Sequence, residues 1–530
     1  MSEQSSQIVE RLWRLKRGIE HGQCRGLSFA HLNNLLRDPA YRQEVLDKVV
    51  RNGTESMSKL ALEIQAMDAG EPLMASAQPP HRQVEDPDEP QADEEPQGGS
   101  WHSALWLVPV LGLVLTVAVG FTMLGDDTVR ISDDITTETI WESGNTYILK
   151  DIIKVRDTAL TIEAGARIEG TARSALIVGR NAKLAARGTA KEPVVFTSHN
   201  PTGKRQRGDW GGVVLLGNAP VNQPGALIEG LEEGTGIRQF GGDDGRSNCG
   251  VITHTRIEFA GHEVYKGNEL NGLTLGGCGN TTIIRNVQVH RPLDDGIEMF
   301  GGTVDLKKVL ITGAGDDGID WDWGWRGRVQ FAVIQQHPDA GDNAFEGDNN
   351  GNNHQALPRS EPTFYNVTLA GASRGNKQNR GMVLREGTNG HFHNMIVDGY
   401  ELGTLDTRDE VAPRVRKDEL TFTHNLIADT GDSNDEYRET GDRDDDFGFD
   451  EQAWIRKASH DNTFRMETVL QSMARNIEGP GFKPILPRRQ MTAKKPPQSE
   501  FFEESAVFQG AFRPGSKESW TDGWTAFPPN

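Results

Sequence analysis

Acidic side chains recur in three short stretches of the second half of the sequence. "RPLDDGIEMF" begins at Arg291, "GAGDDGIDWDWG" at Gly313 and "AGDNAFEGDN" at Ala340. Paired carboxyl groups can perform general acid–base chemistry or bind a hard cation. Asp followed by Gly is also ordinary turn chemistry, because Asp hydrogen-bonds its own backbone and Gly adopts positive φ. The three stretches therefore admit a catalytic site, a metal site or the turns of a repeating scaffold.

Placed in register, the stretches form columns of acidic residues. The columns are Asp294, Asp316 and Asp342; Asp295, Asp317 and Asn343; Glu298, Asp320 and Glu346; and Asp322 and Asp348. In a parallel stack, neighbours in one column lie about 4.8 Å apart, and like charges at that distance repel strongly. Such a stack needs a bound cation, protonated carboxyl groups, or neutralising basic residues. Candidates for the last role are Arg326, Arg328, Arg380 and Arg385.

A calcium site is the first interpretation of these columns. Ca²⁺ takes 6–8 oxygen ligands in flexible geometry. The third column points outward and does not belong to the turns, so it favours a metal more than the Asp-Asp-Gly pairs do. The predicted ligands are Glu298, Asp320, Glu346, Asp322 and Asp348. The alternative for the Asp-Asp-Gly pairs is turn formation alone.

A catalytic interpretation stays open beside the calcium site. Two carboxyl groups about 6.5–9.5 Å apart can hydrolyse a glycosidic bond. "GDDG", which holds Asp316 and Asp317, is similar to the paired-Asp element of polygalacturonases, but their companion motifs are not found in the expected order. A polysaccharide lyase would instead use calcium beside a base such as Lys307 or Arg326. Each of these basic residues can equally be a solvated face residue.

Aromatic and amide residues follow the second acidic stretch and suit carbohydrate binding. "DWDWGW" places Trp321, Trp323 and Trp325 two positions apart. Trp321 is expected to fill the interior, while Trp323 and Trp325 lie near the turn and are expected to be exposed. Trp rings bind sugar faces well. The predicted ligand-binding residues are Trp323, Trp325, Asn349 and His354.

Two series of short strands must position these side chains. One series aligns on Val287, Val309, Val333, Val367, Met395 and Leu426, and the other on Gly272, Gly296, Gly318, Ala344 and Gly381. Their shared, drifting period of just over twenty residues indicates a solenoid in which insertions lengthen the turns. The predicted fold is mainly β, a right-handed parallel β-helix with apolar residues stacked inside. A β-sandwich is the alternative, but hairpin signals are sparse.

Several stretches resemble a known family in the same order. "LTIEAGARIEG", "GDWGGVVLLGNAP" and "DDGIDWDWGWRGRVQFAVIQQ" are similar to coils of pectin-lyase-like right-handed parallel β-helix proteins of the bacterial cell envelope, and "FFEESAVFQGAFRPGSKESWTDGWTAFP" to their closing segment. The resemblance covers residues 140–530. It implies the fold, while the family is largely uncharacterised and implies little about activity.

The N-terminal part differs in composition from the rest. Residues 1–68 show helical periodicity, residues 69–100 form an acidic, Pro-rich linker, and Trp101–Leu124 carries no charged residue. About 20 apolar residues span a bilayer, so residues 101–124 predict one transmembrane helix. The β-helix is then expected over residues 140–430, followed by an acidic loop and a C-terminal cap over 431–530.

Charge and cysteine content set the expected environment. The net charge of −21 argues against a nucleic-acid partner. Cys249 and Cys278 stand 29 residues apart, close to one repeat, so they can lie on adjacent rungs and form a disulfide if this domain is outside the cytoplasm. A disulfide in the β-helix and the basic residues before position 20 favour a cytoplasmic N-terminus. The protein is then expected in the inner membrane of a bacterium, with the β-helix in the periplasm.

The sequence as a whole predicts a single-pass envelope protein that binds a glycan or another surface ligand without catalysis, with Ca²⁺ as the candidate cofactor. One alternative is a calcium-dependent polysaccharide lyase or glycoside hydrolase. Another is a transmembrane scaffold or sensor in which residues 1–68 bind a cytoplasmic protein.

Overall fold

The structure is a computed structural model. It describes residues 39–68 with isolated residues before them, and residues 128–529 except 232–236, 262, 266–267, 373–379, 416, 431–445, 447, 472–474 and 488–490. The chain divides into a helical N-terminal unit and a unit that begins at Asp126. The expected linker and the expected membrane helix at 101–124 lie outside the described residues. Within the described ranges, no helix has the length and apolarity needed to cross a membrane.

The N-terminal unit has a small core of its own. Helix α3 (Pro39–Asn52) packs against α4 (Glu55–Met67), and the Thr54 side chain caps α4 by accepting a hydrogen bond from the Met57 amide. Four apolar residues at helical spacing, Ile8, Leu12, Leu15 and Ile19, are buried in this core. Arg42 is fully buried and pairs with Asp68 at 2.5 Å, which ties the end of α4 to α3.

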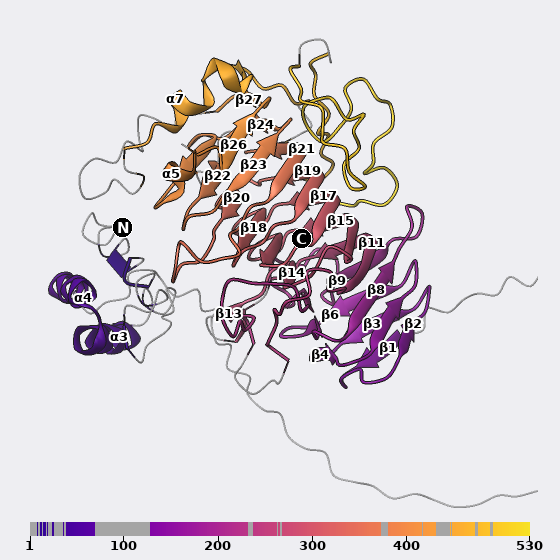
Figure 1. Ribbon diagram of the computed structural model, residues 1–530. Helices are drawn as coiled ribbons and strands as arrows, with labels where there is room; N and C mark the ends of the chain where they lie inside the picture. The colour runs from indigo at the N-terminus through magenta and orange to yellow at the C-terminus, as the bar shows by residue number, and fades with distance from the viewer. Residues whose placement is uncertain are drawn as a thin grey trace, which may run out of the picture. The chain divides into compact units, whose positions relative to one another are not determined.

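The second unit is built from parallel strands stacked in successive coils (Figure 1). A nine-stranded sheet contains one short strand from each coil. Its strands are β4 (Ile152–Val155), β7 (Ala175–Val178), β10 (Val213–Leu216), β14 (Leu273–Gly276), β16 (Ile297–Phe300), β18 (Ile319–Asp322), β20 (Asn343–Gly347), β22 (Arg380–Leu384) and β25 (Leu405–Thr407).

A seventeen-stranded sheet supplies the rest of each coil. Its strands are β1 (Thr128–Ile131), β2 (Thr139–Trp141), β3 (Thr146–Leu149), β5 (Ala159–Ile162), β6 (Arg167–Gly170), β8 (Lys183–Arg187), β9 (Val194–Ser198), β11 (Gly250–Glu258), β15 (Ile283–His290), β17 (Asp305–Thr312), β19 (Arg328–Gln335), β21 (Thr363–Ala370), β23 (Gly390–His393), β24 (Ile396–Asp398), β26 (Leu420–Thr423), β27 (Leu426–Ala428) and β28 (Thr463–Arg465). Parallel pairing thus begins before residue 140 and continues past 430, the limits expected from the sequence.

A single left-handed residue bends the large sheet in each of seven coils. These corner residues are His254, Asn286, Lys308, Phe331, Asn366, Asn394 and His424, with φ between 44° and 63°. The ladder skips the corner position, so each of these coils has three straight segments. Parallel pairing and repeated corners are the features of a parallel β-helix.

The observed register confirms one predicted strand series and corrects the other. Leu273, Ile297, Ile319, Phe345 and Met382 are successive partners, as the second series requires. In the first series, Val309 pairs with Ala332 and not with Val333, and Leu426 pairs with Ile396 and not with Met395. A one-residue slip moves a side chain to the other face. Val333 and Leu426 accordingly point outward, into an apolar cluster beneath the C-terminal segment.

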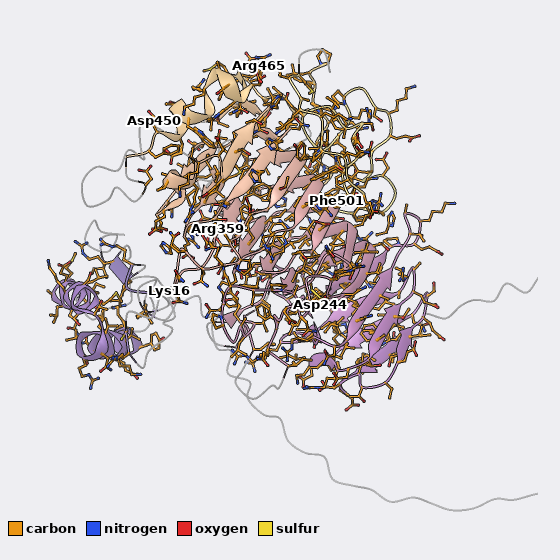
Figure 2. All side chains as sticks on the ribbon, viewed as in Figure 1. Lys16, Asp244, Arg359, Asp450, Arg465 and Phe501 are labelled. Carbon is orange, nitrogen blue, oxygen red and sulfur yellow. A yellow bond between two sulfur atoms is a disulfide. The ribbon has the colours of Figure 1, made fainter. Side chains whose placement is uncertain are left out.

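A C-terminal cap was expected over residues 431–530; the part around residues 451–455 does cover the last coils, but the segment from residue 499 onward does not. The segment lies instead along the outer face of the large sheet, where Phe501 is labelled in Figure 2. Gln288 of β15 exchanges two hydrogen bonds with Ala526, and Asn366 donates to the carbonyl of Phe508. The last coils are covered by α5 (Val411–Val415) and α7 (Glu451–Ile455), whose apolar residues join the interior core.

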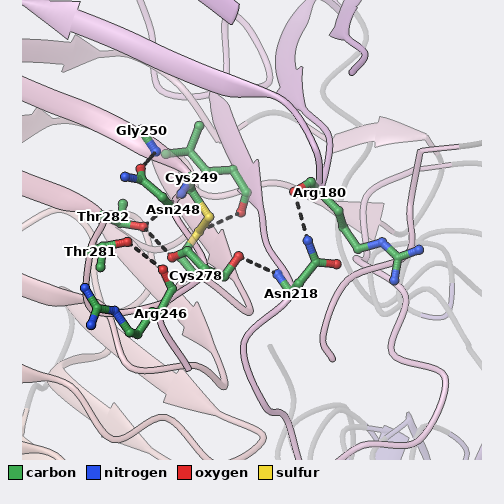
Figure 3. Close-up of a disulfide and its surroundings, with 11 residues drawn as sticks. Arg180, Asn218, Arg246, Asn248, Cys249, Gly250, Cys278, Thr281 and Thr282 are labelled. Carbon is green, nitrogen blue, oxygen red and sulfur yellow. Dashed lines mark hydrogen bonds between the residues drawn. A yellow bond between two sulfur atoms is a disulfide. The ribbon is translucent and has the colours of Figure 1, made fainter. Parts of the chain in front are cut away.

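The predicted disulfide between Cys249 and Cys278 is present (Figure 3). The two Cα atoms are 5.7 Å apart, and both residues are buried. Cys249 precedes β11 and Cys278 follows β14, so the bond closes one complete coil, which includes the hairpin β12 (Glu263–Tyr265) and β13 (Asn268–Glu269). Thr282 accepts a hydrogen bond from the Cys249 amide through its hydroxyl, which holds the bridge against the next coil.

Replacing both Cys249 and Cys278 by Ala is expected to lower the free energy of unfolding by about 3–4 kcal/mol, because the bond restricts a 29-residue loop in the unfolded chain. Thermal unfolding of the wild type with and without reductant, beside the double variant, measures the effect. Reductant should lower the wild-type Tm to that of the variant and leave the variant unchanged. Equal Tm values for oxidised wild type and variant would contradict the role.

Candidate metal centre

The outward column of the nine-stranded sheet carries three acidic residues in succession. Glu298 of β16 pairs with Asp320 of β18, which pairs with Glu346 of β20. Thr274 precedes the three acids in this column and Val383 follows them, and the next rung after Val383 carries Asp406. Adjacent carboxyl groups therefore occur at these three rungs. The inward neighbours Ile297 and Met299 belong to the core, which confirms the predicted alternation.

A second column forms a hydrogen-bonded ladder along the solenoid axis. Asn271 accepts from the amide of Asp295, Asp295 from the amide of Asp317 at 2.8 Å, and Asp317 from the amide of Asn343 at 2.6 Å. Each step uses one side-chain carbonyl oxygen, which Asn provides as well as Asp. The two middle rungs therefore carry negative charges that the ladder itself does not need.

The two columns converge on one cluster of oxygen atoms. One carboxylate oxygen each from Asp295, Glu298 and Asp320 lie within 4.8 Å of one another, and Asp294, Asp295 and Asp316 form a second such triad. The Asn271 amide donates a hydrogen bond to Glu298. Oδ1 of Asp320 is covered and has no hydrogen-bond partner among the described residues. An oxygen-only donor set with an unpaired carboxylate oxygen is suited to a hard cation.

Burial raises the pKa of five carboxyl groups well above their usual values. They are Asp295, Glu298, Asp317, Asp320 and Asp322. Neighbouring negative charges raise these pKa values further: Asp294 acts on Asp295, and Glu229 on Glu298. Without a cation the cluster therefore favours protonated carboxyl groups, and a bound cation would favour the ionised form.

Arg385 compensates the other end of the acidic columns. Its guanidinium forms an ion pair with Glu346 and a bidentate pair with Asp348, the latter with both closest contacts at 2.8 Å. Burial raises the pKa of Asp348 to about 8, against the opposing effect of Arg385. Of the five predicted metal ligands, Glu346 and Asp348 thus pair with Arg385, and Glu298 and Asp320 lie in the triad with Asp295. The fifth, Asp322, accepts a hydrogen bond from the Trp323 amide.

The sequence profile described as "Pectate-lyase like beta helix domain" matches residues 133–525. The chain belongs to this family. The resemblance to pectin-lyase-like β-helix proteins is thereby confirmed, and the match suggests a carbohydrate-related function. No curated protein and no solved structure matches the chain significantly.

The pectate-lyase-like domain does not expose the predicted ligand-binding residues as expected. Trp325 is completely buried and donates its indole N–H to the carbonyl of Val304 at 3.0 Å. Asn349 is also completely buried, and its side-chain oxygen accepts from the Asn222 side chain and the Ser360 amide. The interior of the coil continues past Trp321 to Trp325, so the prediction of exposure is wrong for Trp325, and Asn349, predicted to bind a ligand, has no accessible surface.

The other two predicted ligand-binding residues are only partly covered. Trp323 is half-buried and stacks on Phe240 with ring centroids 5.8 Å apart, and Phe240 belongs to the long loop before β11. His354 contacts Glu410 through Nδ1. The Trp323 backbone amide donates a hydrogen bond to Asp322, and no described contact joins Trp323 or His354 to the triad of Asp295, Glu298 and Asp320.

The basic candidates are not gathered around the acidic cluster. Lys307 lies on β17 of the large sheet and donates to the carbonyl of Phe501. Arg326 is exposed in the turn after β18. Of the acidic pair, Asp316 is exposed and Asp317 is buried in the ladder. The expected turn chemistry of the Asp-Asp-Gly pairs is not found: Gly296 and Gly318 do not have positive φ, and Asp295 and Asp317 bond the backbone of the next coil.

Two features of the site escaped the sequence analysis. The hydrogen-bonded ladder could have been predicted from the sequence, because Asn271 and Asn343 stand in the same column as the two Asp residues, one on each side. The second feature is a cavity of about 390 Å³ beside Asp294 and Asp316, which the sequence could not indicate because its lining residues come from distant segments. They are Gln206, Arg207, Leu293, Gly315 and Ala340. Arg207 reaches this turn cavity from a distant loop, where it pairs with Asp339 at 3.1 Å.

Asp295→Asn combined with Asp317→Asn is expected to stabilise the cation-free protein at neutral pH by about 1–3 kcal/mol, because the ladder is kept and two buried charges are removed. A carboxyl group with a raised folded-state pKa contributes stability at low pH that is lost as the pH rises through that pKa. The cation-free wild type should therefore lose stability as the pH rises above about 4. The variant should show a flatter profile.

Chemical denaturation in a chelating buffer across this pH range measures both expectations. Asp342→Asn is the matched control, since it removes an exposed charge from the neighbouring column. A double variant less stable than wild type at every pH would show that the two carboxylates are structural.

Proposed function

We propose that this protein binds a glycan through a calcium ion held by the cluster of Asp295, Glu298 and Asp320, without chemical turnover. The observation that carries the proposal is the unpaired Oδ1 of Asp320 in a triad of carboxylate oxygens within 4.8 Å of one another. The ladder supports it, because Asp stands at two rungs where Asn would serve the fold. Family membership supports a carbohydrate as the ligand class.

Calcium is preferred over other divalent ions for chemical reasons. The triad offers carboxylate oxygens, and the surrounding groups Asp294, Asp316 and Asp317 are also carboxylates. Zinc and copper favour imidazole and thiolate ligands, and Mg²⁺ requires near-ideal octahedral geometry. A calcium ion with 6–8 ligands would take three carboxylates here and leave positions for water or sugar hydroxyl groups.

The turn cavity is the place where a glycan would meet the ion. Its lining residues Leu293 and Gly315 each adjoin an Asp of the second triad, Asp294 and Asp316 respectively. Arg207 on the same cavity offers hydrogen-bond donors beside these acids. A sugar hydroxyl or carboxylate in the cavity would thus have both a cation and a guanidinium within reach.

Binding is favoured over catalysis because of where the basic residues lie. A calcium-dependent lyase needs a free base beside the ion. Lys307 belongs to the other sheet, and Arg207 at the turn cavity is engaged in an ion pair with Asp339. Incubation of the protein with polygalacturonate and calcium, followed by analysis of product size, tests this part of the proposal. Release of shortened oligosaccharides that depends on Asp295 would overturn it in favour of a polysaccharide lyase or hydrolase.

Calcium is expected to raise the Tm of the wild type and to bind with measurable heat in calorimetry. Saturation at 100 times Kd adds about 2.7 kcal/mol of stability. Glu298→Gln and Asp320→Asn should each remove most of this shift, because each deletes one ionised ligand. Asp342→Asn should respond to calcium as the wild type does. A calcium shift that persists in both ligand variants would place the ion elsewhere.

We also propose that residues 101–124 anchor the protein in a membrane with the β-helix on the oxidising side. The uncharged composition of this segment supports the span, and the Cys249–Cys278 bond supports an oxidising compartment. The N-terminal helical unit, with its own core, would then face the cytoplasm and could hold a protein partner.

Labelling with a membrane-impermeant thiol reagent in spheroplasts tests this topology. Lys517→Cys, an exposed position of the β-helix unit, should be labelled in intact spheroplasts. Ser5→Cys should be labelled only after lysis. The reverse pattern would invert the topology, and labelling of both before lysis would contradict a membrane span.

A further inference from the structure

A hollow of about 140 Å³ lies between the outer face of the large sheet and the C-terminal segment. Lys308 of β17 and Phe331 of β19 line one side, and Phe508, Phe512 and Trp520 line the other. These strands belong to a different sheet from the acidic columns. The hollow is therefore separate from the calcium cluster and from the turn cavity.

Lys308 and Phe331 occupy corner positions that do not favour their residue types. Their φ angles are 59° and 63°, while Asn286 and Asn366 hold the corners of the adjacent coils at 55° and 57°. Asn tolerates the left-handed region, whereas a bulky side chain is an outlier there. Asn would therefore form the bend more easily in both coils. Lys308 and Phe331 stand there instead, and both side chains face the hollow.

Two stacked aromatic pairs hold the walls of the hollow in place. The rings of Phe331 and Phe508 are 6.3 Å apart at an interplanar angle of 18°, and those of Phe512 and Trp520 are 5.5 Å apart at 7°. The indole N–H of Trp520 donates to the carbonyl of Ala511 at 3.1 Å. Trp520 remains half-buried, so ring surface stays available on a wall that is already ordered.

The rim of the hollow combines hydrogen-bond donors and acceptors. The Lys308 ammonium makes no hydrogen bond or ion pair within the part of the chain that the structure describes. Glu503 and Arg513 pair at 3.5 Å across the rim, and both side chains are more than 40% exposed. Ser519 adds a hydroxyl group. Apolar ring faces together with convergent polar groups are what a protein offers to a small amphipathic ligand.

We propose that this hollow binds a single neutral pyranose ring without a metal ion. The C–H face of the sugar lies on Trp520, and its hydroxyl groups accept from Lys308 and bond the rim at Glu503 and Ser519. The small volume suits one ring at the end of a chain or on a branch. A glycan could then be held at two places, by calcium at the small sheet and by aromatic contact at the large one.

Ligand-observed saturation-transfer NMR on the full chain tests the site, with the methyl glycosides of glucose, galactose and mannose at millimolar concentration. EDTA is present throughout, so the outcome does not depend on the calcium proposal. At least one glycoside should receive saturation at its ring C–H protons. Methyl galacturonoside is measured beside them as the acidic comparison. Saturation confined to this acidic sugar, or absent for every sugar, would overturn the proposal.

Lys308→Asn is the decisive variant, because Asn suits the left-handed corner and the fold is preserved. It should weaken binding about tenfold, as expected for loss of a charged hydrogen bond. Trp520→Ala should abolish the saturation transfer, and Lys517→Asn, which removes a lysine from the same segment outside the hollow, should bind as the wild type does. Equal affinity of Lys308→Asn and wild type would place the sugar elsewhere.

Discussion

The structure depends on one constraint, the parallel stacking of coils at a repeated register. Stacking places equivalent residues of successive coils about 4.8 Å apart, so any residue type that repeats in the sequence repeats as a column in space. An apolar repeat such as Leu273, Ile297 and Ile319 becomes a continuous core. An acidic repeat becomes a line of like charges, which stacking alone cannot stabilise.

The acidic columns are compensated in different ways at different rungs. Asp295 and Asp317 satisfy one oxygen each by accepting the amide of the next coil. Glu346 and Asp348 share the guanidinium of Arg385. Between these two ends, burial and then the charge of neighbouring carboxylates raise the pKa values of Glu298 and Asp320, and Arg385 offsets only part of this effect at Asp320. Glu298 and Asp320 are therefore the candidate functional residues, since the scaffold does not need a charge at either position.

The register of a strand could be predicted from the sequence where a distinctive motif accompanies it, and not where hydrophobicity was the only signal. The acidic rungs were placed in correct register because Asp-Asp-Gly precedes the strand in two adjacent coils and Asp-Asn-Ala stands at the same place in the third. The large sheet slipped at Val333 and Leu426 because its outer face is also apolar, under the C-terminal segment, and hydrophobicity then cannot distinguish the two faces. Arg385 and Arg207 act through contacts across 37 and 132 residues, which no local pattern indicates.

The same packing explains why function must lie on the outside of the coils. Trp321, Trp325, Phe345 and Phe364 fill the interior at their level with rings in mutual contact, so a tryptophan near a turn is drawn inward. Only outward columns and corners can depart from what the core requires. Asp in place of Asn in the ladder, and Lys308 and Phe331 in place of Asn at the corner, are two such departures. In each case a residue that suits the fold less well provides a charged or aromatic group that Asn lacks, and each site lies beside a concave surface.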